Sequence, residues 1–430
     1  MAAMRIVRGR DAALEAVGTR AIATLDPEVE GAVAEIVEDV RLRGDTAVFE
    51  ATARFDRAEL ATLLVPTEQI VAAGARLDLE LRDAIRLAID RIERYYRRQP
   101  AGGFLDSEVG AVLAQIVRPI ERVGIYVPAG TSPLFSSLLM SAVPARVAGV
   151  ERIVVATPPR PDGSVAPEIL YAADQLEIET VVRAGGAQAI AALAFGTESV
   201  PRVDKIVGPG NRYVVAAKRR VFGTVGIESL PGPTETMVIA DDAADPRHVA
   251  ADLVAQAEHA GAQPVLVSWS RTTIDAALEA VEAALIDLPT GDAARESLEQ
   301  RGLCLLVADA SEATELANAY APEHLCLLVR EPWALLPDVR NAGGVFLGTH
   351  SMEALGDYVA GPSHVMPTGA TARFASAVNV RDFQKVIPVL SLSPAAVAEI
   401  GPAAVRMARA EGLEAHARAI LARLDRSDEA

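Results

Sequence analysis

The stretch RVGIYVPAGTSPLFSSLLMSAVPARVAGVERIVVA, residues 122–156, decides the fold of this chain. It opens and closes on short apolar runs, which predict strands at 122–127 and 152–156. The apolar residues between them, at 136–147, predict a helix. A strand, a helix and another strand in this order are typical of a parallel sheet covered by helices.

The same alternation continues along the chain in two series. Further strands are expected at 180–183, 205–207, 236–240, 264–267, 303–307, 325–329 and 344–347, with helices at 166–174, 187–195 and 211–221 and helical segments between the later strands. We therefore expect an α/β fold with two Rossmann-like parallel-sheet units and helical N- and C-terminal extensions.

On this basis the chain divides into four parts. We expect an N-terminal helical segment at 1–25, a first α/β domain at 26–121 plus 234–380, a second α/β domain at 122–233, and a helical tail at 381–430. Asp26-Pro27 predicts a helix that reaches Arg43, and a long helical pattern covers 67–98. The tail helix carries an apolar stripe, which needs an apolar surface to cover it. The members of this stripe are Leu413, Ala417, Ile420 and Leu424.

Composition and charge favour a small-molecule partner. The 430 residues include 41 basic and 58 acidic ones, so the formal charge of -17 opposes binding to nucleic acid or to an anionic membrane. No stretch is long and apolar enough to span a bilayer, and Met1–Arg5 leads into a charged segment without the apolar core of a signal peptide. Cys304 and Cys326 lie inside apolar runs, as buried reduced thiols do. We expect a cytoplasmic protein.

The motif Gln256-Ala257-Glu258-His259 places an amide and an imidazole near the end of a helix that begins at Asp245-Pro246. Gln256 and His259 are three residues apart, so they share a face of that helix. A carbonyl oxygen and a neutral imidazole nitrogen are both competent zinc ligands. Two ligands do not complete a site, and a histidine of the core or of the surface remains the alternative for so short a pattern.

Glycine-containing turns follow three strands of the first series. These turns cover 126–130 with Tyr126, 184–188 with Gln188, and 208–211 with Asn211. At the carboxyl ends of strands in open α/β sheets, glycine lets the backbone approach a phosphate, and a helix N-terminus favours negative charge. None of the three is the Gly-x-Gly-x-x-Gly fingerprint. They indicate either a nucleotide bound in a nonstandard way or ordinary turns between strands and helices.

Polar residues with catalytic chemistry gather in the second half of the chain. Glu323-His324 sets a carboxylate beside an imidazole, and a loop punctuated by glycine and proline contains Asp357 and His364. The tail adds Glu411 and His416. Four of the six histidines therefore accompany a carboxylate or an amide, which favours one shared site, although packing could explain each histidine alone.

In order and number, these motifs resemble those of the histidinol dehydrogenase family from Arg41 to His416, nearly the full chain. The matching motifs are Arg41-Leu42-Arg43-Gly44-Asp45, Phe195 to Pro201, Val203 to Asn211, Gln256 to His259, Ala321 to Leu325, Gly356-Asp357-Tyr358 and Glu411 to His416. The resemblance implies that the domain at 26–121 plus 234–380 carries the metal and acid/base residues, that the domain at 122–233 binds NAD, and that the tail forms a homodimer.

The resemblance also implies a role for particular residues. Zinc would be held by Gln256, His259, Asp357 and His416, the last reaching in from the other subunit so that the active sites are shared. Glu323 and His324 would be the acid/base pair. Substrate contacts would come from Thr234, Gln256, His259, His324, Asp357, Glu411 and His416. NAD contacts would come from Tyr126, Gln188 and Asn211.

The activity implied is the oxidation of L-histidinol to L-histidine through L-histidinal, the last step of histidine biosynthesis, with two NAD molecules reduced. Thr234 stands where the family usually has serine, Ser363 where asparagine is frequent, and Met352 where a proline is common. Relatives oxidise other small polar alcohols, including a sulfonated propanediol, so such a zinc- and NAD-dependent dehydrogenase is the first alternative. A noncatalytic nucleotide-binding relative is the second, and it would keep the glycine turns without needing Glu323 beside His324.

Overall fold

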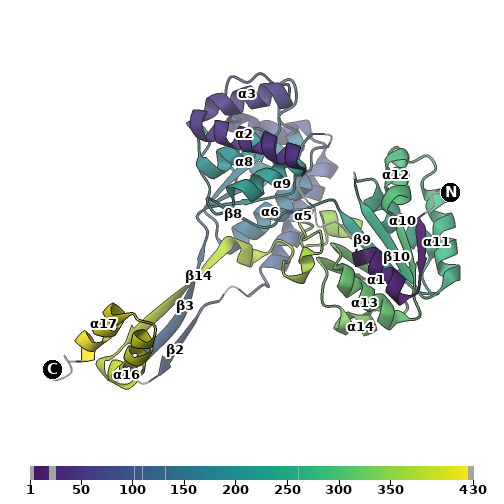
Figure 1. Cartoon of the computed structure of the whole chain (residues 1–430). Coiled ribbons are helices and arrows are strands. Elements are labelled where there is room, and N and C mark those ends of the chain that lie inside the picture. The colour runs from purple at the N-terminus through teal and green to yellow at the C-terminus, as the bar shows by residue number, and fades with distance from the viewer. Residues whose placement is uncertain are drawn as a thin grey trace. The chain divides into compact units, whose positions relative to one another are not determined.

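The stretch at 122–157 lies at the centre of a five-stranded sheet in the computed structural model (Figure 1). The strands are β4 (Arg122–Tyr126), β5 (Arg152–Thr157), β6 (Thr180–Arg183), β7 (Lys205–Val207) and β8 (Gly226–Ile227). They pair in parallel in the order β6-β5-β4-β7-β8. The chain thus starts in the middle at β4, builds one half of the sheet and crosses back to β7, as in dinucleotide-binding folds.

The structure describes residues 4–18, 26–100, 102–108, 110–130, 132–259 and 261–424. Of the expected N-terminal segment, residues 1–3 and 19–25 lie outside these ranges, as do residues 425–430 of the tail. The chain divides into two compact units, one of Met1–Arg98 with Glu121–Phe383 and one of Gln99–Ile120 with Gln384–Ala430. Both parallel sheets belong to the first unit.

Helices α2 (Pro27–Arg43) and α3 (Asp45–Phe55) pack on the five-stranded sheet's own helices α8 (Gly186–Phe195) and α9 (Arg212–Val221). Valines recur one turn apart on α2, and their side chains share a core with those of α8 and α9. This differs from the expected domain at 26–121 plus 234–380, because the apolar stripe of α2 is buried by α8 and α9. Helices α6 (Phe135–Ala148) and α7 (Pro167–Gln175) connect β4, β5 and β6.

The second parallel sheet has six strands in the order β1-β11-β10-β9-β12-β13. The strands are β1 (Arg5–Arg8), β9 (Glu235–Ala240), β10 (Gln263–Ser268), β11 (Leu303–Leu306), β12 (His324–Leu328) and β13 (Gly344–Leu347). From β9 to β13 it repeats the strand order of the first sheet. The strand β1 corrects the expectation of a wholly helical N-terminal segment, because this short run pairs along the edge strand β11.

Helices cover both faces of the six-stranded sheet (Figure 1). One face packs against α10 (Pro246–Ala257), α11 (Arg271–Ala284) and α12 (Gly291–Arg301). The other packs against α1 (Arg10–Gly18) and α13 (Ala310–Tyr320). The short helices α14 (Pro332–Leu335) and α15 (Glu353–Tyr358) precede and follow β13. The expectation of two Rossmann-like units with helices on both faces is confirmed.

The helical pattern expected at 67–98 is broken in the structure. It forms α4 (Thr67–Ala72), a short 3-10 turn at Ala73–Arg76, and α5 (Leu79–Tyr96). The break falls at Asp78, whose side chain accepts a hydrogen bond from the backbone N–H of Leu81 at 2.7 Å and so caps a new helix.

The second unit is built around an antiparallel sheet in the order β14-β3-β2. Its strands are β2 (Phe104–Glu108), β3 (Ala111–Pro119) and β14 (Gln384–Leu392), followed by α16 (Pro394–Ala410) and α17 (Glu414–Leu424). The strand β14 corrects the expectation of a wholly helical tail. Most of the apolar stripe at 413–424 is covered by α16 of the same chain, since Ala417 is buried and Ile420 and Leu424 lie against Gly401, whereas Leu413 is exposed. Among the described residues, no helix is long and apolar enough to cross a membrane.

Candidate active site

The acid/base candidates and Thr234 lie at the amino ends of two neighbouring strands in the six-stranded sheet. Thr234 directly precedes β9, and Glu323 directly precedes β12, of which His324 is the first residue. His324 pairs with Thr236 across the two strands. Helix α10 returns to the same edge, so Gln256 in its last turn joins them. The general rule for open α/β sheets points to the opposite, carboxyl edge.

A single hydroxyl connects Gln256 and Glu323. Thr234 Oγ1 lies 2.9 Å from Gln256 Oε1 and 2.8 Å from Glu323 Oε2. Glu323 Oε2 also accepts the backbone N–H of Glu235 at 3.1 Å. One hydroxyl hydrogen serves only one of the two acceptors at a time, so the protonation of Glu323 decides which way Thr234 donates. Burial raises the pKa of Glu323 well above its ordinary value.

The imidazole of His324 has one nitrogen that donates a hydrogen bond and one that keeps its lone pair. Its Nδ1 lies 3.1 Å from the carbonyl oxygen of Glu235, so Nδ1–H donates and Nε2 keeps its lone pair. Nε2 is buried and has no hydrogen-bond partner among the described residues. Burial, helped by His364 and His259 and opposed by the hydrogen bond to Glu235, lowers the pKa of His324 to about 4. At neutral pH the ring is a neutral base with Nε2 available.

Two more candidates, Asp357 and His364, lie beside each other. His364 Nδ1 donates to the backbone oxygen of Asp357 at 2.8 Å and lies 3.9 Å from its carboxylate. His364 Nε2 lies 3.3 Å from the Ser137 hydroxyl of α6. The pKa of His364 is lowered to about 4, mainly by burial and partly by His259. The sequence analysis named His364 as a candidate but assigned it no role. In the structure it lies beside Asp357.

The candidate metal ligands at this site are of chemical types that can bind a zinc ion. Gln256 offers an amide oxygen, His259 an imidazole and Asp357 a carboxylate, which are ligand types that zinc accepts. Burial raises the pKa of Asp357 to about 6, and a bound cation would reverse that effect. Within the described residues, no three His, Cys, Asp or Glu side chains come close enough to hold a metal by themselves. Glu411 and His416 lie in the second unit, where both are exposed.

The cofactor candidates lie together at the carboxyl edge of the five-stranded sheet. Tyr126 ends β4, and its hydroxyl accepts the N–H of Gly186 at 3.1 Å. Gln188 lies in the first turn of α8. Asn211 caps α9, where its side-chain oxygen accepts the N–H groups of Tyr213 and Val214 at 3.0 and 3.2 Å. The direction of chain progression reverses between β4 and β7, which is where such sheets bind dinucleotides.

Two carboxylates of these sites were not found from the sequence. Asp56 at the end of α3 accepts from the N–H of Gly185 at 3.3 Å and from Gln188 Nε2 at 3.4 Å. Glu353 of α15 is buried and accepts the hydroxyl of Thr236 and the thiol of Cys326, the latter at 3.0 Å. The signal for Glu353 was its spacing, because it lies one helical turn before Asp357. No local signal pointed to Asp56.

Comparisons with known proteins agree with the motif pattern. The profile of the family described as histidinol dehydrogenase matches residues 20–424. A histidinol dehydrogenase of Deinococcus radiodurans is 58% identical over 397 residues, which are 92% of this chain and 91% of that protein. One of Thermus thermophilus is 54% identical over 398 residues, covering 92% and 95%. The crystal structure of histidinol dehydrogenase from Elizabethkingia anophelis has a TM-score of 0.94 at 36% identity and covers 98% of each chain.

Proposed function

The chain belongs to the histidinol dehydrogenase family and is an oxidoreductase of histidine biosynthesis; we propose that it uses NAD and one zinc ion per subunit. It converts L-histidinol to L-histidine through L-histidinal, and two NAD molecules are reduced in turn. The observation that carries this proposal is the buried Nε2 of His324, which has no hydrogen-bond partner among the residues that the structure describes. It lies beside Glu323, which Thr234 links to Gln256.

The metal would be held by Gln256, His259, Asp357 and His416 of the partner subunit. When bound, zinc supplies a Lewis acid that orients the substrate and polarises its oxygen. Thr234, Gln256, His259, His324, Asp357, Glu411 and His416 would contact the substrate. Tyr126, Gln188 and Asn211 would contact NAD. An exposed carboxylate at Glu411 suits a substrate that carries an amine or an imidazole.

His324 serves the first oxidation. Its Nε2 would accept the proton of the substrate hydroxyl, and bound NAD would supply the hydride acceptor for the adjacent carbon. The Nδ1–H bond to the carbonyl of Glu235 holds the ring in the tautomer that this role needs. The products of this half are L-histidinal, NADH and one proton.

Glu323 serves the second oxidation. Its carboxylate would accept a proton from the water that adds to the aldehyde. The hydrate would then lose a hydroxyl proton and a hydride, for which the second NAD would be the acceptor, and L-histidine would be left. Burial raises the pKa of Glu323, so its ionised form is a stronger base than an exposed carboxylate. The Thr234 hydroxyl can turn its hydrogen toward Glu323 when the acid is ionised and toward Gln256 when it is protonated.

A direct assay tests this proposal. Purified protein with L-histidinol, NAD and zinc should form two NADH per L-histidine, and chelation should abolish turnover until zinc is added back. A sulfonated propanediol, supplied in place of histidinol, should give little NADH. Turnover by metal-free protein would contradict the zinc proposal, and a preference for the diol would assign the alternative substrate.

We further propose that the active unit is a cytoplasmic homodimer whose two sites are shared between subunits. The two cysteines, Cys304 and Cys326, are free and buried, as suits a reducing compartment. The ligand set offered by the first unit is one short of the usual four, which suits completion by a second chain.

A further inference from the structure

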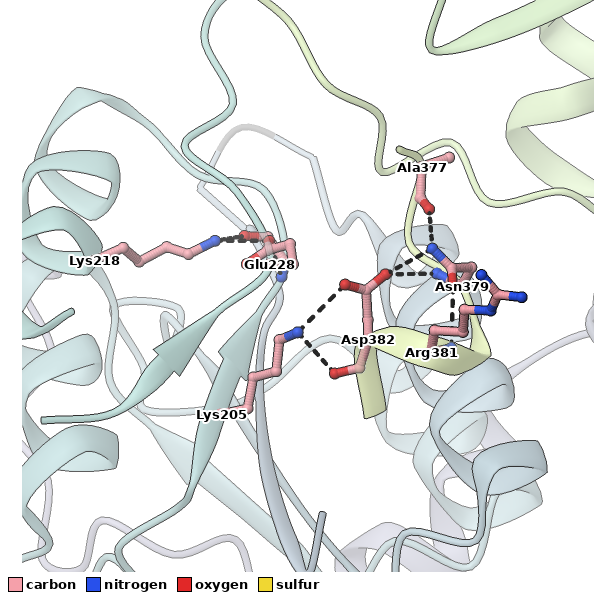
Figure 2. A network of polar contacts seen from close by, with 8 residues as sticks. Lys205, Lys218, Glu228, Ala377, Asn379, Arg381 and Asp382 are labelled. Atoms are coloured by element: carbon pink, nitrogen blue, oxygen red, sulfur yellow. Dashed lines mark hydrogen bonds and ion pairs between the residues drawn. The ribbon is translucent and has the colours of Figure 1, made fainter. Parts of the chain in front are cut away.

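A buried ion pair lies directly behind the turn that follows β7. Lys218 of α9 is fully buried, and its Nζ lies 2.7 Å from Oε1 of Glu228, whose side chain is 3% exposed. Figure 2 shows Lys218 reaching across to Glu228, apart from a second pair formed by Lys205 and Asp382. Neither Lys218 nor Glu228 was singled out in the sequence.

The pair forms hydrogen bonds with both backbone polar groups of Gly208, its N–H and its carbonyl oxygen. The N–H of Gly208 donates to Glu228 Oε1 at 2.8 Å, and its carbonyl oxygen accepts from Lys218 Nζ at 3.0 Å. Gly208 has a φ of +115°, and a Cβ there would lie 2.1 Å from the backbone oxygen of Tyr126. The pair therefore fixes a residue at which the turn after β7 lies close against the end of β4.

The same turn leads to Asn211 within three residues. Asn211 caps α9, the helix that also carries Lys218, so the turn is tied at Gly208 and again at the start of α9. A shift of Gly208 would move both the backbone of the turn and its contact with Tyr126. Two of the three proposed NAD residues, Tyr126 and Asn211, thus lie next to this glycine in space or in sequence.

Stability alone is a poor explanation for this pair. Desolvating two ions often costs as much as their attraction returns, and apolar residues of similar volume commonly stabilise as well or better. Glu228 Oε2 is buried without a partner among the described residues, so the pair is not fully satisfied even in place. A pair retained at that cost is better explained by the geometry it imposes on Gly208.

We propose that Lys218 and Glu228 are positioning residues for NAD: together they hold Gly208 so that Tyr126 and Asn211 form the cofactor site. The inference rests on the proposed function, because it takes NAD to bind at this turn. The pair touches neither the histidinol candidates nor the zinc candidates, so its effect is confined to the cofactor.

The test uses the full-length protein and two double variants. Lys218→Met with Glu228→Leu removes the pair, whereas Lys218→Met with Glu228→Gln restores a carbonyl that can accept the N–H of Gly208. Lys205→Met is the matched control, since Lys205 is a partly buried lysine on β7 whose partner is Asp382 rather than Gly208. The Kd for NAD is measured by titration, with Tm, zinc content and the KM for histidinol measured beside it.

We expect the Met/Leu variant to raise the Kd for NAD by roughly 10-fold to 100-fold, as misplacement of a binding group does, with zinc content and the KM for histidinol unchanged. The Met/Gln variant should show a smaller rise, and Lys205→Met should lower Tm without a change in the Kd. A folded Met/Leu variant with the wild-type Kd overturns the inference, and so does an equal rise in Lys205→Met.

If the Met/Leu variant fails to fold, the Met/Gln variant provides the test, because it still lacks the lysine that binds the carbonyl oxygen of Gly208. An unchanged Kd for NAD in the Met/Gln variant then overturns the inference. Absence of NAD binding by the wild-type protein overturns the proposed function and the inference together. Wild-type binding with unchanged affinity in the variants overturns the inference alone.

Discussion

At the scale of residues, the acid/base pair shows how one environment prepares two neighbours for different roles. Burial raises the pKa of Glu323 and lowers that of His324 because it disfavours the charged form of each. Their adjacency in sequence indicated the pair. The tautomer of His324 was beyond sequence reasoning, because it is set by the carbonyl of Glu235, a residue 89 positions away.

We predict that the two residues separate the two half-reactions. Glu323→Gln should slow the oxidation of added L-histidinal by about 100-fold to 10,000-fold, which is the usual contribution of a general base. It should slow the oxidation of L-histidinol to the aldehyde much less. His324→Asn should slow mainly the first half. Single-turnover formation of NADH from each substrate measures this. Thr234→Ser, which keeps the hydroxyl, is the control, and equal losses in both halves from both variants would show that the roles are not divided.

A second residue prediction concerns Asp252, one helical turn before Gln256 on α10. Burial raises its pKa to about 6, against a partial lowering by His248. The carboxyl of Asp252 therefore loses its proton at lower pH in the unfolded chain than in the folded one. As a result, the free energy of unfolding of the wild-type protein falls as pH rises from about 4 to 6, and it remains at the lower value above pH 6. Asp252→Asn should raise the free energy of unfolding at pH 8 by on the order of 1 to 2 kcal/mol.

Urea unfolding of the metal-free protein from pH 4.5 to 8 measures this effect. The stability difference between Asp252→Asn and wild type should widen up to about pH 6 and remain constant above it. Asp90→Asn, at an exposed position of α5, is the control for the loss of one carboxylate. A difference for Asp252→Asn that does not vary with pH would contradict the burial argument.

At the scale of elements, Glu353 ties α15 to the two strands that begin at the acid/base site. One carboxyl oxygen accepts from Thr236 of β9 and from Cys326 of β12, and burial raises its pKa to about 8. Glu353 thereby fixes Asp357, one turn later, relative to His324. Outer residues that orient metal ligands commonly change metal affinity by about 10-fold to 100-fold.

We therefore predict that Glu353→Ala lowers zinc affinity by about 10-fold to 100-fold, whereas Glu353→Gln keeps affinity near the wild-type value. Glutamine retains an oxygen that can accept from Thr236 and Cys326, and alanine does not. Competition with a chromophoric chelator measures the affinity without reference to turnover. Equal behaviour of the two variants would mean that the hydrogen bonds of Glu353 do not hold α15.

The elements also show what the sequence could predict. Strands β6 and β7 fall at the expected residues, since each is a short apolar run bounded by turn residues. The pairing of β3 with β14 was missed because the partners lie more than 260 residues apart and β14 contains Pro388, a residue unfavourable to strands except at an edge. The site at the amino ends of β9 and β12 was found from motifs, whereas the rule for open sheets indicated the other edge.

At the scale of the whole molecule, the chain repeats one parallel strand order twice and divides the work between the copies. The five-stranded sheet offers its carboxyl edge to the proposed NAD site, and the six-stranded sheet offers its amino edge to the proposed zinc and acid/base residues. The second unit exposes large apolar side chains on its strands, including Leu105, Leu113 and Leu390 at 72%, 49% and 64% exposure. Apolar surface of this kind is typical of a surface that contacts a partner.

We predict that the partner is a second copy and that His416 completes its site. Helix α16 covers the apolar stripe at 413–424 except at Leu413, so this stripe is no longer a reason to expect a partner. The prediction rests on the exposed strands of the second unit and on His416, which is exposed there. Exchange of identical elements is a low-cost route to a closed dimer with two symmetric sites. Oligomeric mass in solution should therefore be that of two chains.

Complementation tests whether the site is shared. A His416→Ala protomer is mixed with a His259→Ala protomer, each inactive as a homodimer, and heterodimers are isolated through two different affinity tags. In a shared site, one of the two sites of the heterodimer carries both substitutions and the other carries neither, so activity should return toward half of the wild-type value per dimer. If all ligands came from one chain, every site would carry one substitution, and a verified heterodimer would stay inactive. A heterodimer of two His259→Ala protomers, differently tagged, is the control and should remain inactive in either case.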